Sequence, residues 1–250
     1  MTEMLRDPLS YIFCLGFPVI MLILFYVINR NTGGATPVFE MASLLPGILM
    51  FSFTFMMLFG ALLLSTDRQS AFLLRLYTSP MRTWEFLAGY LCPLFLLGIA
   101  QEIVCVVAGW VLTLIGGGNF LPFGKVVLLC LWMLPMLLTF LLLGLLFGTL
   151  LNEKSAPGVC SIFISAAGVL GGCWMPLDTM GGFETFCRVL PFYPAVYIGR
   201  IITGATHTTG GVYAFDTVAK LGLIPLILTL LLAATLASVA FSRMAMSDRK

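Results

Sequence analysis

Six apolar runs, each near or above the length that crosses a bilayer, constrain this chain more than any other feature. A helix needs about 20 apolar residues to span the hydrocarbon core. A mean hydropathy of +1.06 and a charged fraction of only 10% lie far from the values of soluble domains. We therefore predict an all-α integral membrane protein, folded as a single domain over residues 1–250, with six transmembrane helices at about 9–28, 42–65, 86–115, 126–151, 158–174 and 218–241.

The distribution of lysine and arginine predicts the orientation, because cytoplasmic loops of membrane proteins are enriched in these residues. If both termini are cytoplasmic, the inner side holds eight of them: Arg6, Arg68, Arg75, Arg82, Lys154, Arg243, Arg249 and Lys250. The outer side holds five: Arg30, Lys125, Arg188, Arg200 and Lys220. We expect a multi-pass protein of a bacterial inner or plasma membrane with both termini in the cytoplasm.

Several function classes lack the residues that they need. A net charge of +2 spread over several loops forms no basic stripe for phosphates, so we expect no nucleic-acid partner. The segment GNFLPFGKV has the wrong glycine spacing for a Walker A loop and places Val126 where Ser or Thr would hold magnesium. His207 is the only histidine, and no GxSxG or HExxH motif is present. We expect no catalytic, cofactor-binding or metal-binding residues in this chain.

The connector between the second and third runs is longer than a simple joint requires. In STDRQSAFLLRLYTSPMRTWEF, Asp67 occupies an N-cap or first-turn position, and Pro80 ends the helix after Ser79. Four residues form an apolar stripe with Arg68 and Arg75 beside it: Phe72, Leu73, Leu76 and Tyr77. This pattern predicts a short amphipathic helix on the cytoplasmic surface, either as an interfacial anchor or as a lever moved by another protein.

The stretch GGCWMPLDTM, residues 171–180, interrupts the fifth apolar run. Pro176 cannot donate a backbone hydrogen bond, and the glycine pair weakens the preceding turn. A stripe of Phe183, Phe186, Val189 and Leu190 follows, interleaved with Glu184 and Arg188, and then come the aromatic residues Phe192, Tyr193 and Tyr197. Irregular backbone at membrane depth must pack in protein or line a cavity. We predict two short helices that dip into the outer leaflet and cap a pathway; the alternative is an amphipathic loop on the lipid surface.

Three smaller features leave alternatives open. Glu102, beside Gln101 near the middle of the third run, is either interhelical glue or a contact for substrate or protons. Gly144 with Gly148, and Gly168 with Gly172, allow close helix packing, within one subunit or at a dimer seam. Seven cysteines lack CxxC spacing; Cys173 and Cys187 flank the interrupted segment and are either paired or free.

Two motifs resemble the permease subunits of ABC-2 type exporters. The connector is similar to the family pattern E-R-x-x-G-T-L-E-R-L-L-x-S-P at Asp67, Arg68, Leu73, Arg75, Leu76, Thr78, Ser79 and Pro80, and departs from it at Ala71, Phe72 and Leu74. The interrupted segment is similar to the pattern S-G-x-F-F-P-L-x-x-L-P-x-W followed by N-P-x-x-Y. That likeness rests on Gly172, Trp174, Pro176, Leu177, Met180, Phe183, Pro191 and Arg200, while Gly181 replaces a common proline.

The resemblance implies the ABC-2, or type V exporter, fold: a cytoplasmic coupling helix between helices 2 and 3, and a re-entrant segment between helices 5 and 6. The residues that would couple to the ATPase are Asp67, Arg68, Leu73, Arg75, Leu76, Tyr77, Ser79 and Pro80. Those that would cap the exit are Gly172, Trp174, Pro176, Phe183, Pro191 and Tyr193.

The resemblance also implies partners and a transport function. The partners would be an ABC ATPase subunit that holds ATP and magnesium, and a second copy of the permease or a homologous one. The chain would export an amphipathic substrate (drug, antibiotic, peptide or lipid) by alternating access. Two alternatives remain: export of a polysaccharide or lipid-linked glycan, and a non-ABC channel or assembly subunit.

Overall fold

A computed structural model describes residues 8–34, 36–69, 83–118 and 120–247. Six long helices dominate these residues: α1 (Pro8–Asn31), α2 (Met41–Gln69), α4 (Thr83–Ile115), α5 (Phe123–Leu150), α6 (Ala156–Leu170) and α9 (Thr217–Ser247). Two shorter helices, α7 (Gly182–Val189) and α8 (Phe192–Thr203), lie between α6 and α9, and two single 3-10 turns are η2 (Pro37–Phe39) and η3 (Leu177–Thr179).

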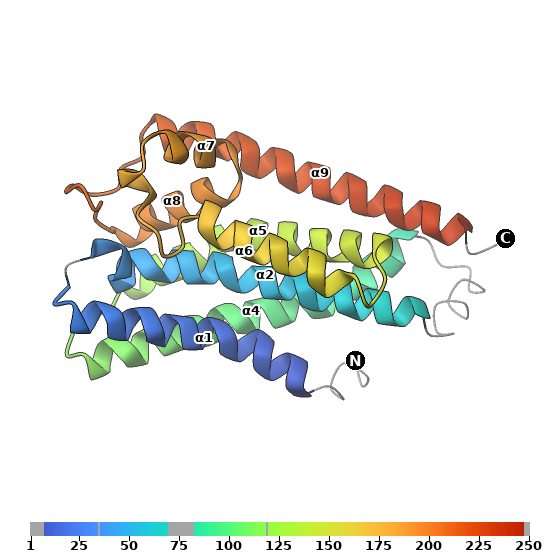
Figure 1. Ribbon diagram of the computed structural model, residues 1–250, viewed down its shortest axis with the longest axis horizontal. Coiled ribbons are helices and arrows are strands. Elements are labelled where there is room, and N and C mark those ends of the chain that lie inside the picture. Colours follow the sequence, from blue (N-terminus) through green and yellow to red (C-terminus); the bar gives the residue numbers. More distant parts are fainter. Residues whose placement is uncertain (1–7, 35, 70–82, 119, 248–250) are drawn as a thin grey trace.

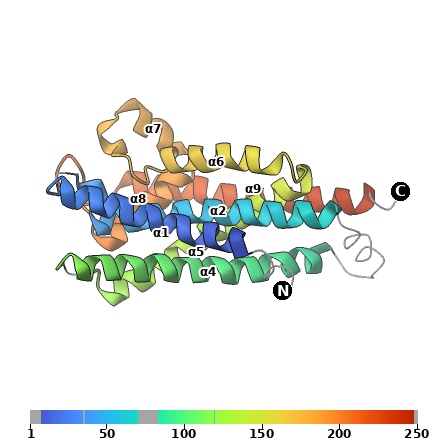
Figure 2. The same ribbon diagram turned by 60° about the horizontal axis from the view of Figure 1, so that its bottom comes forward.

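The long helices run side by side as a bundle with α2 at its centre (Figures 1 and 2). Helix α2 packs against α1, α4, α5, α6 and α8, and most of its side chains are buried. One end of the bundle, here called the cap end, contains η3, α7 and α8. The opposite end, here called the connector end, contains the last turn of α2, the first turn of α4 and the link between α5 and α6.

In the part of the chain that the structure describes, four helices are long and apolar enough to cross a membrane: Met41–Arg68 of α2, Leu87–Ile115 of α4, Phe123–Leu150 of α5 and Thr217–Ser242 of α9. In the remaining two predicted spans, the described apolar parts are shorter: Leu15–Asn31 of α1 and Ala156–Leu170 of α6. The prediction of six membrane-spanning helices is thus supported for four, and it stays a prediction for α1 and α6. Helix α6 also ends at Leu170, four residues before the predicted boundary, because the glycine pair follows it.

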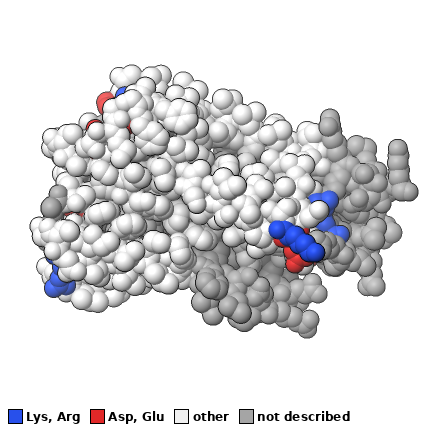
Figure 3. Space-filling model, in the orientation of Figure 1, with Lys and Arg blue, Asp and Glu red and all other residues white. Residues whose placement is uncertain are grey.

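Charged residues avoid the middle of the bundle. On the face shown in Figure 3, acidic and basic side chains lie near the two ends, and the surface between them is uncharged. Within the six long helices, Glu102 is the one acidic or basic residue far from a helix end. Many apolar side chains of α4 and α9 are exposed, including Ile103, Val107, Ile224 and Leu231. An apolar belt of this kind is expected of a multi-pass membrane protein, because the surrounding lipid is itself apolar.

The start of α1 and the end of α9 both point toward the connector end (Figure 1). This arrangement agrees with two termini on the same side of the membrane. That this side is the cytoplasm remains a prediction from the distribution of positive charge.

Glycines allow close contacts within the bundle. A Cβ atom on Gly144 of α5 would lie 2.5 Å from the carbonyl oxygen of Met57 in α2, and one on Gly148 would lie 2.9 Å from that of Ala61. Likewise, a Cβ on Gly168 would lie 2.6 Å from the Trp174 ring. These glycines therefore serve packing within one subunit, which is the first of the two interpretations of their spacing.

Candidate functional site

The connector end is held together by the first two residues of the predicted coupling motif. The Arg68 guanidinium donates hydrogen bonds to the carbonyl oxygens of Gly148 (3.2 Å) and Thr149. These carbonyls belong to the last turn of α5, where no intrahelical donor is available, and a cation there is favourable. Asp67 accepts a hydrogen bond of 2.6 Å from the hydroxyl of Tyr90 on α4. The end of α2 is thus fastened to both α4 and α5.

The structure corrects the position of Asp67 within its helix. The sequence predicts an N-cap or first-turn position in the connector helix, but α2 continues to Gln69, so Asp67 lies in the last turn of α2. The contacts with α4 and α5 account for this extension, because tertiary bonds stabilise a helical turn beyond its local propensity. The other predicted coupling residues, Leu73, Arg75, Leu76, Tyr77, Ser79 and Pro80, lie outside the described residues, and the amphipathic helix stays a prediction.

The break after α6 occurs at the glycine pair. Gly172 has a φ of +62°, a left-handed conformation that other residues rarely adopt, and a Cβ there would lie 2.8 Å from the Leu177 side chain. Trp174 then turns back onto the bundle, where it stacks on Phe25 of α1 (5.7 Å between ring centroids) and meets Phe51 of α2 edge-on (4.7 Å). The interruption therefore directs the chain inward rather than into solvent.

Arg200 joins three separate segments at the cap end. Its side chain is fully buried, and it donates hydrogen bonds to the carbonyl oxygen of Gly172 (2.7 Å), to that of Ser43 (3.2 Å) and to the Tyr213 hydroxyl (3.4 Å). These acceptors belong to the broken end of α6, the start of α2 and the loop between α8 and α9. A buried guanidinium with several hydrogen bonds fixes the relative positions of its partners. Arg200 and its three hydrogen bonds are here called the clasp of the cap end.

A row of interacting polar side chains extends from Arg200 toward η3. The ring of Tyr213 stacks on His207, with 3.7 Å between centroids, and His207 Nδ1 lies 3.3 Å from the Asp178 carboxylate. The same carboxylate accepts a hydrogen bond of 2.9 Å from the Thr208 backbone. Burial raises the pKa of Asp178, but hydrogen bonds from the Thr208 and Asp178 backbone N–H groups and from His207, together with the charge of Arg200, outweigh it. The net result is a pKa below its usual value, so Asp178 is ionised at neutral pH.

The predicted exit-cap residues differ in how deeply they are buried. Gly172, Pro191 and Tyr193 are buried, and the Tyr193 hydroxyl donates a hydrogen bond of 2.9 Å to Glu184, which also pairs with Arg188 at 2.8 Å. Trp174 and Pro176 are partly buried, while Phe183 is exposed.

Helices α7 and α8, which contain or adjoin these residues, also differ in burial. Helix α7 exposes the apolar stripe of Phe183, Phe186 and Val189, as expected of a helix on a lipid surface. Helix α8 is buried against α2, α5 and α9. Each of the two sequence interpretations of the segment thus fits one helix, and insertion of either into the membrane stays a prediction. Cys173 and Cys187 are both buried free thiols in the structure.

The sequence does not identify Arg200, His207 and Asp178 as members of one polar cluster. From the sequence, Arg200 counts only as a positive charge and a motif match, and His207 only as the single histidine. A signal was present for Arg200, because a single cation within the apolar run VYIGRIIT must find partners when that helix is buried. No local pattern indicates that Asp178, 29 residues away, approaches His207.

Glu102 is buried within the bundle, on the part of α4 near Cys130 of α5. Its Oε1 atom has no hydrogen-bond partner among the described residues. The neighbouring Gln101 makes the interhelical contact instead, with its Nε2 atom 3.5 Å from the Leu15 carbonyl oxygen of α1. The role of interhelical glue therefore fits Gln101 better than Glu102, and a role of Glu102 in transport stays a hypothesis.

Substitution of Glu102 tests whether its side chain stabilises the contact between helices. We expect Glu102→Met to keep or raise the unfolding temperature of the purified protein, because leaving a buried oxygen unpaired costs about 1–3 kcal/mol. Glu102→Gln, which keeps the shape and remains polar, is the matched control and should change the temperature little. A clear fall with methionine but not with glutamine would instead restore the glue interpretation.

The family model of the ABC-2 type transporter matches residues 1–203, which is most of the chain and ends with the last residue of α8. No curated protein and no solved structure matches the chain. The matched region contains the connector, the interrupted segment and the Arg200 clasp. The chain is a multi-pass membrane protein that belongs to the ABC-2 type transporter family.

Proposed function

We propose that the chain is the transmembrane permease subunit of an ATP-driven exporter. In this proposal a separate ABC ATPase binds ATP and magnesium and contacts residues 67–80 at the cytoplasmic face. Two copies of the chain, or one copy and a homologous permease, form the pathway. The substrate is an amphipathic molecule such as a drug, antibiotic, peptide or lipid. Membership of the ABC-2 family supports a role in transport.

The observation that supports this proposal most directly is the connection that α2 makes between the two ends. Asp67 and Arg68 fasten its last turn to α4 and α5, and the Ser43 carbonyl in its first turn is bound by Arg200. A helix of 29 residues is about 43 Å long, enough to cross the membrane. A displacement at the connector is therefore transmitted along α2 to the clasp of the cap end.

In the proposed mechanism, closure of the ATPase subunits on ATP presses on the connector and tilts α2 together with α4 and α5. The tilt shifts the Ser43 carbonyl relative to Arg200, so η3, α7 and α8 move with respect to the bundle. The pathway then alternates between inward-open and outward-open arrangements. α1, α2 and α6 line the route, and residues 171–200 cap its exit.

Co-purification tests the proposal. The tagged chain, isolated gently from its native membrane, should bring with it a protein that contains a Walker A motif in near-equal amount. Leu73→Asp/Leu76→Asp in the connector should abolish this association. The matched control is Val212→Asp/Phe215→Asp, two exposed apolar residues in the loop at the cap end, and it should leave the ATPase bound.

Two results would contradict the proposal. Absence of any Walker A protein from the native sample would favour a stand-alone channel or assembly subunit. Loss of the ATPase in both double variants, with unchanged gel-filtration profiles, would show that the connector is not its specific contact. ATP-dependent uptake of candidate substrates into inside-out vesicles, in which the cytoplasmic face points outward, then distinguishes an amphipathic substrate from a lipid-linked glycan.

A further inference from the structure

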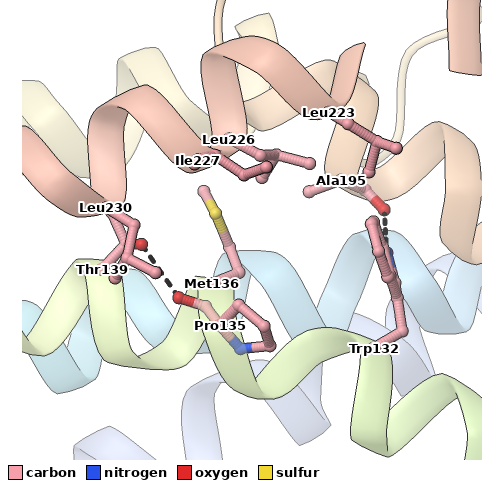
Figure 4. Close-up of a pocket in the computed structure, with 9 residues that line it drawn as sticks. All are labelled: Trp132, Pro135, Met136, Thr139, Ala195, Leu223, Leu226, Ile227 and Leu230. Carbon is pink, nitrogen blue, oxygen red and sulfur yellow. Dashed lines mark hydrogen bonds between the residues drawn. The ribbon is translucent and has the colours of Figure 1, made fainter. Parts of the chain in front are cut away.

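A pocket of about 210 Å³ lies between α5, α8 and α9 (Figure 4). Its walls include Trp132 and Met136 of α5, Ala195 of α8, and Leu223 and Leu226 of α9. The volume is smaller than the roughly 300–1,000 Å³ of pockets for drug-sized ligands. A pocket of this size suits a segment of one hydrocarbon chain.

The polar groups of the walls are already bonded to protein. The indole N–H of Trp132 donates to the Ala195 carbonyl oxygen at 3.0 Å, and the Thr139 hydroxyl donates to the Pro135 carbonyl oxygen at 2.9 Å (Figure 4). The remaining lining is apolar. A polar ligand would lose its hydrogen bonds to water here without replacement, so the pocket favours a hydrocarbon.

The pocket exists because α9 contacts the bundle closely on either side of it. Toward the cap end, Gly222 lies so close to Pro194 of α8 that a Cβ would come within 2.5 Å of the proline Cβ. Toward the connector end, Ala233 and Ala237 pack against α5, where Leu142 is one of their neighbours. Between these contacts α9 presents leucine and isoleucine side chains, which hold its backbone away from α5.

The surroundings of α9 are hydrocarbon. Helix α9 is one of the four helices suited to span the membrane, and its outer side chains are exposed, Ile224 at 61% and Leu228 at 53%. The pocket lies within about 20 Å of the start of α9, in the half of the membrane on the side of the cap end. The molecules available to enter it from the side are therefore the lipids of that leaflet.

Lys220 indicates which lipid. It lies one turn before Leu223, about 4.5 Å closer to the cap end of α9, and its side chain is exposed. A lysine at the end of a span extends its ammonium group to the headgroup level, where it attracts anionic lipids. Lys125, the corresponding cation on α5, already donates to the Thr203 carbonyl oxygen at 3.0 Å. Among the described residues of α9, Lys220 is thus the exposed cation that lies nearest in sequence to the pocket lining.

We propose that this pocket binds one acyl chain of an anionic phospholipid, with Lys220 at the lipid phosphate. The lipid fills the space between α5, α8 and α9 and joins the buried helix of the cap end to the last span. The site belongs to the membrane-embedded fold itself and does not depend on the identity of the exported substrate.

Quenching of Trp132 fluorescence tests the proposal. The variant Trp84→Phe/Trp110→Phe/Trp174→Phe leaves Trp132 as the only tryptophan, and it is reconstituted in phosphatidylcholine vesicles with increasing dibrominated phosphatidylglycerol. Bromine quenches indole at short range, so we expect saturable quenching at a low fraction of the anionic lipid, relieved by unbrominated phosphatidylglycerol. Brominated phosphatidylcholine should require a much higher fraction.

Two substitutions locate the site. Lys220→Gln should raise the half-saturating fraction of phosphatidylglycerol about fivefold, the effect expected of one cation near a lipid surface. Leu226→Phe should remove the saturable component by filling the pocket, whereas Leu231→Phe, on the exposed side of the same helix, should preserve it. A chain that retains only Trp110, which is 49% exposed on α4, reports contact with bulk lipid.

Either of two results would overturn the proposal. Quenching of Trp132 in simple proportion to total brominated lipid, as for Trp110, would mean that the pocket meets only bulk lipid. Absence of quenching by both lipids would mean that another occupant, such as a second copy of the chain, covers the pocket. An unchanged gel-filtration profile for each variant establishes that the fold is retained.

Discussion

Arg200→Met is expected to lower the free energy of unfolding by about 2–5 kcal/mol. The substitution leaves the buried carbonyl oxygens of Gly172 and Ser43 without their donor, and each such loss costs about 1–3 kcal/mol. Relief of the desolvation of the guanidinium offsets a part of this cost. Arg200→Lys keeps the charge but cannot bind both carbonyls in the same fork geometry, so its effect should be intermediate.

Thermal unfolding in mild detergent measures this effect. A thiol-reactive fluorophore is suitable in a background that lacks the exposed Cys92 and the half-buried Cys130, because Cys173 and Cys187 are buried and become reactive when the cap end opens. Arg188→Met is the matched control, since Arg188 is a half-exposed cation whose pair with Glu184 is worth less than about 1 kcal/mol. Equal unfolding temperatures for the two variants would show that Arg200 does not hold the cap end together.

Gly144→Ala is expected to destabilise the bundle by about 1–3 kcal/mol, although alanine is the better helix former by about 1 kcal/mol. The new Cβ would lie 2.5 Å from the Met57 carbonyl oxygen and 3.0 Å from its Cα, and neither backbone atom can move without separating α2 from α5. The overpacking term therefore exceeds the gain in helix propensity.

We expect the opposite result for Gly158→Ala on α6 in the same assay. No atom of the described residues lies within 4 Å of a Cβ at Gly158, so helix propensity alone should act, and the unfolding temperature should rise slightly. If both alanine variants were stabilised, the contact between α2 and α5 would have to be looser than the structure indicates.

Much of the fold was predictable because a membrane imposes a simple length rule. The apolar runs at 42–65, 86–115, 126–151 and 218–241 each correspond to a helix suited to span the membrane, with boundaries within a few residues at most ends. The break at Gly171 and Gly172 was also predictable, since proline and glycine disrupt a helix through local effects. These features depend only on residues that are close together in the chain.

The contacts of the candidate site were harder to predict because they join residues that are distant in the sequence. Arg68 bonds to a carbonyl 80 residues away, and Arg200 to one 157 residues away. A local pattern placed Asp67 at an N-cap or in the first turn of a connector helix, whereas it lies in the last turn of α2 and its hydrogen bond comes from Tyr90 on another helix. The choice between partners of this kind depends on how helices pack, which hydrophobic periodicity does not determine.

The hydrogen bonds of the clasp at Arg200 place few restrictions on the side chains around it. Two of its three acceptors are main-chain oxygens, those of Ser43 and Gly172, which are present whatever side chain occupies the position. The Ser43 hydroxyl itself makes no hydrogen bond among the described residues. Selection can therefore exchange side chains at the cap end while the geometry of the clasp persists. The arginine is constrained, as is the glycine by its positive φ, but the surrounding sequence retains freedom to drift.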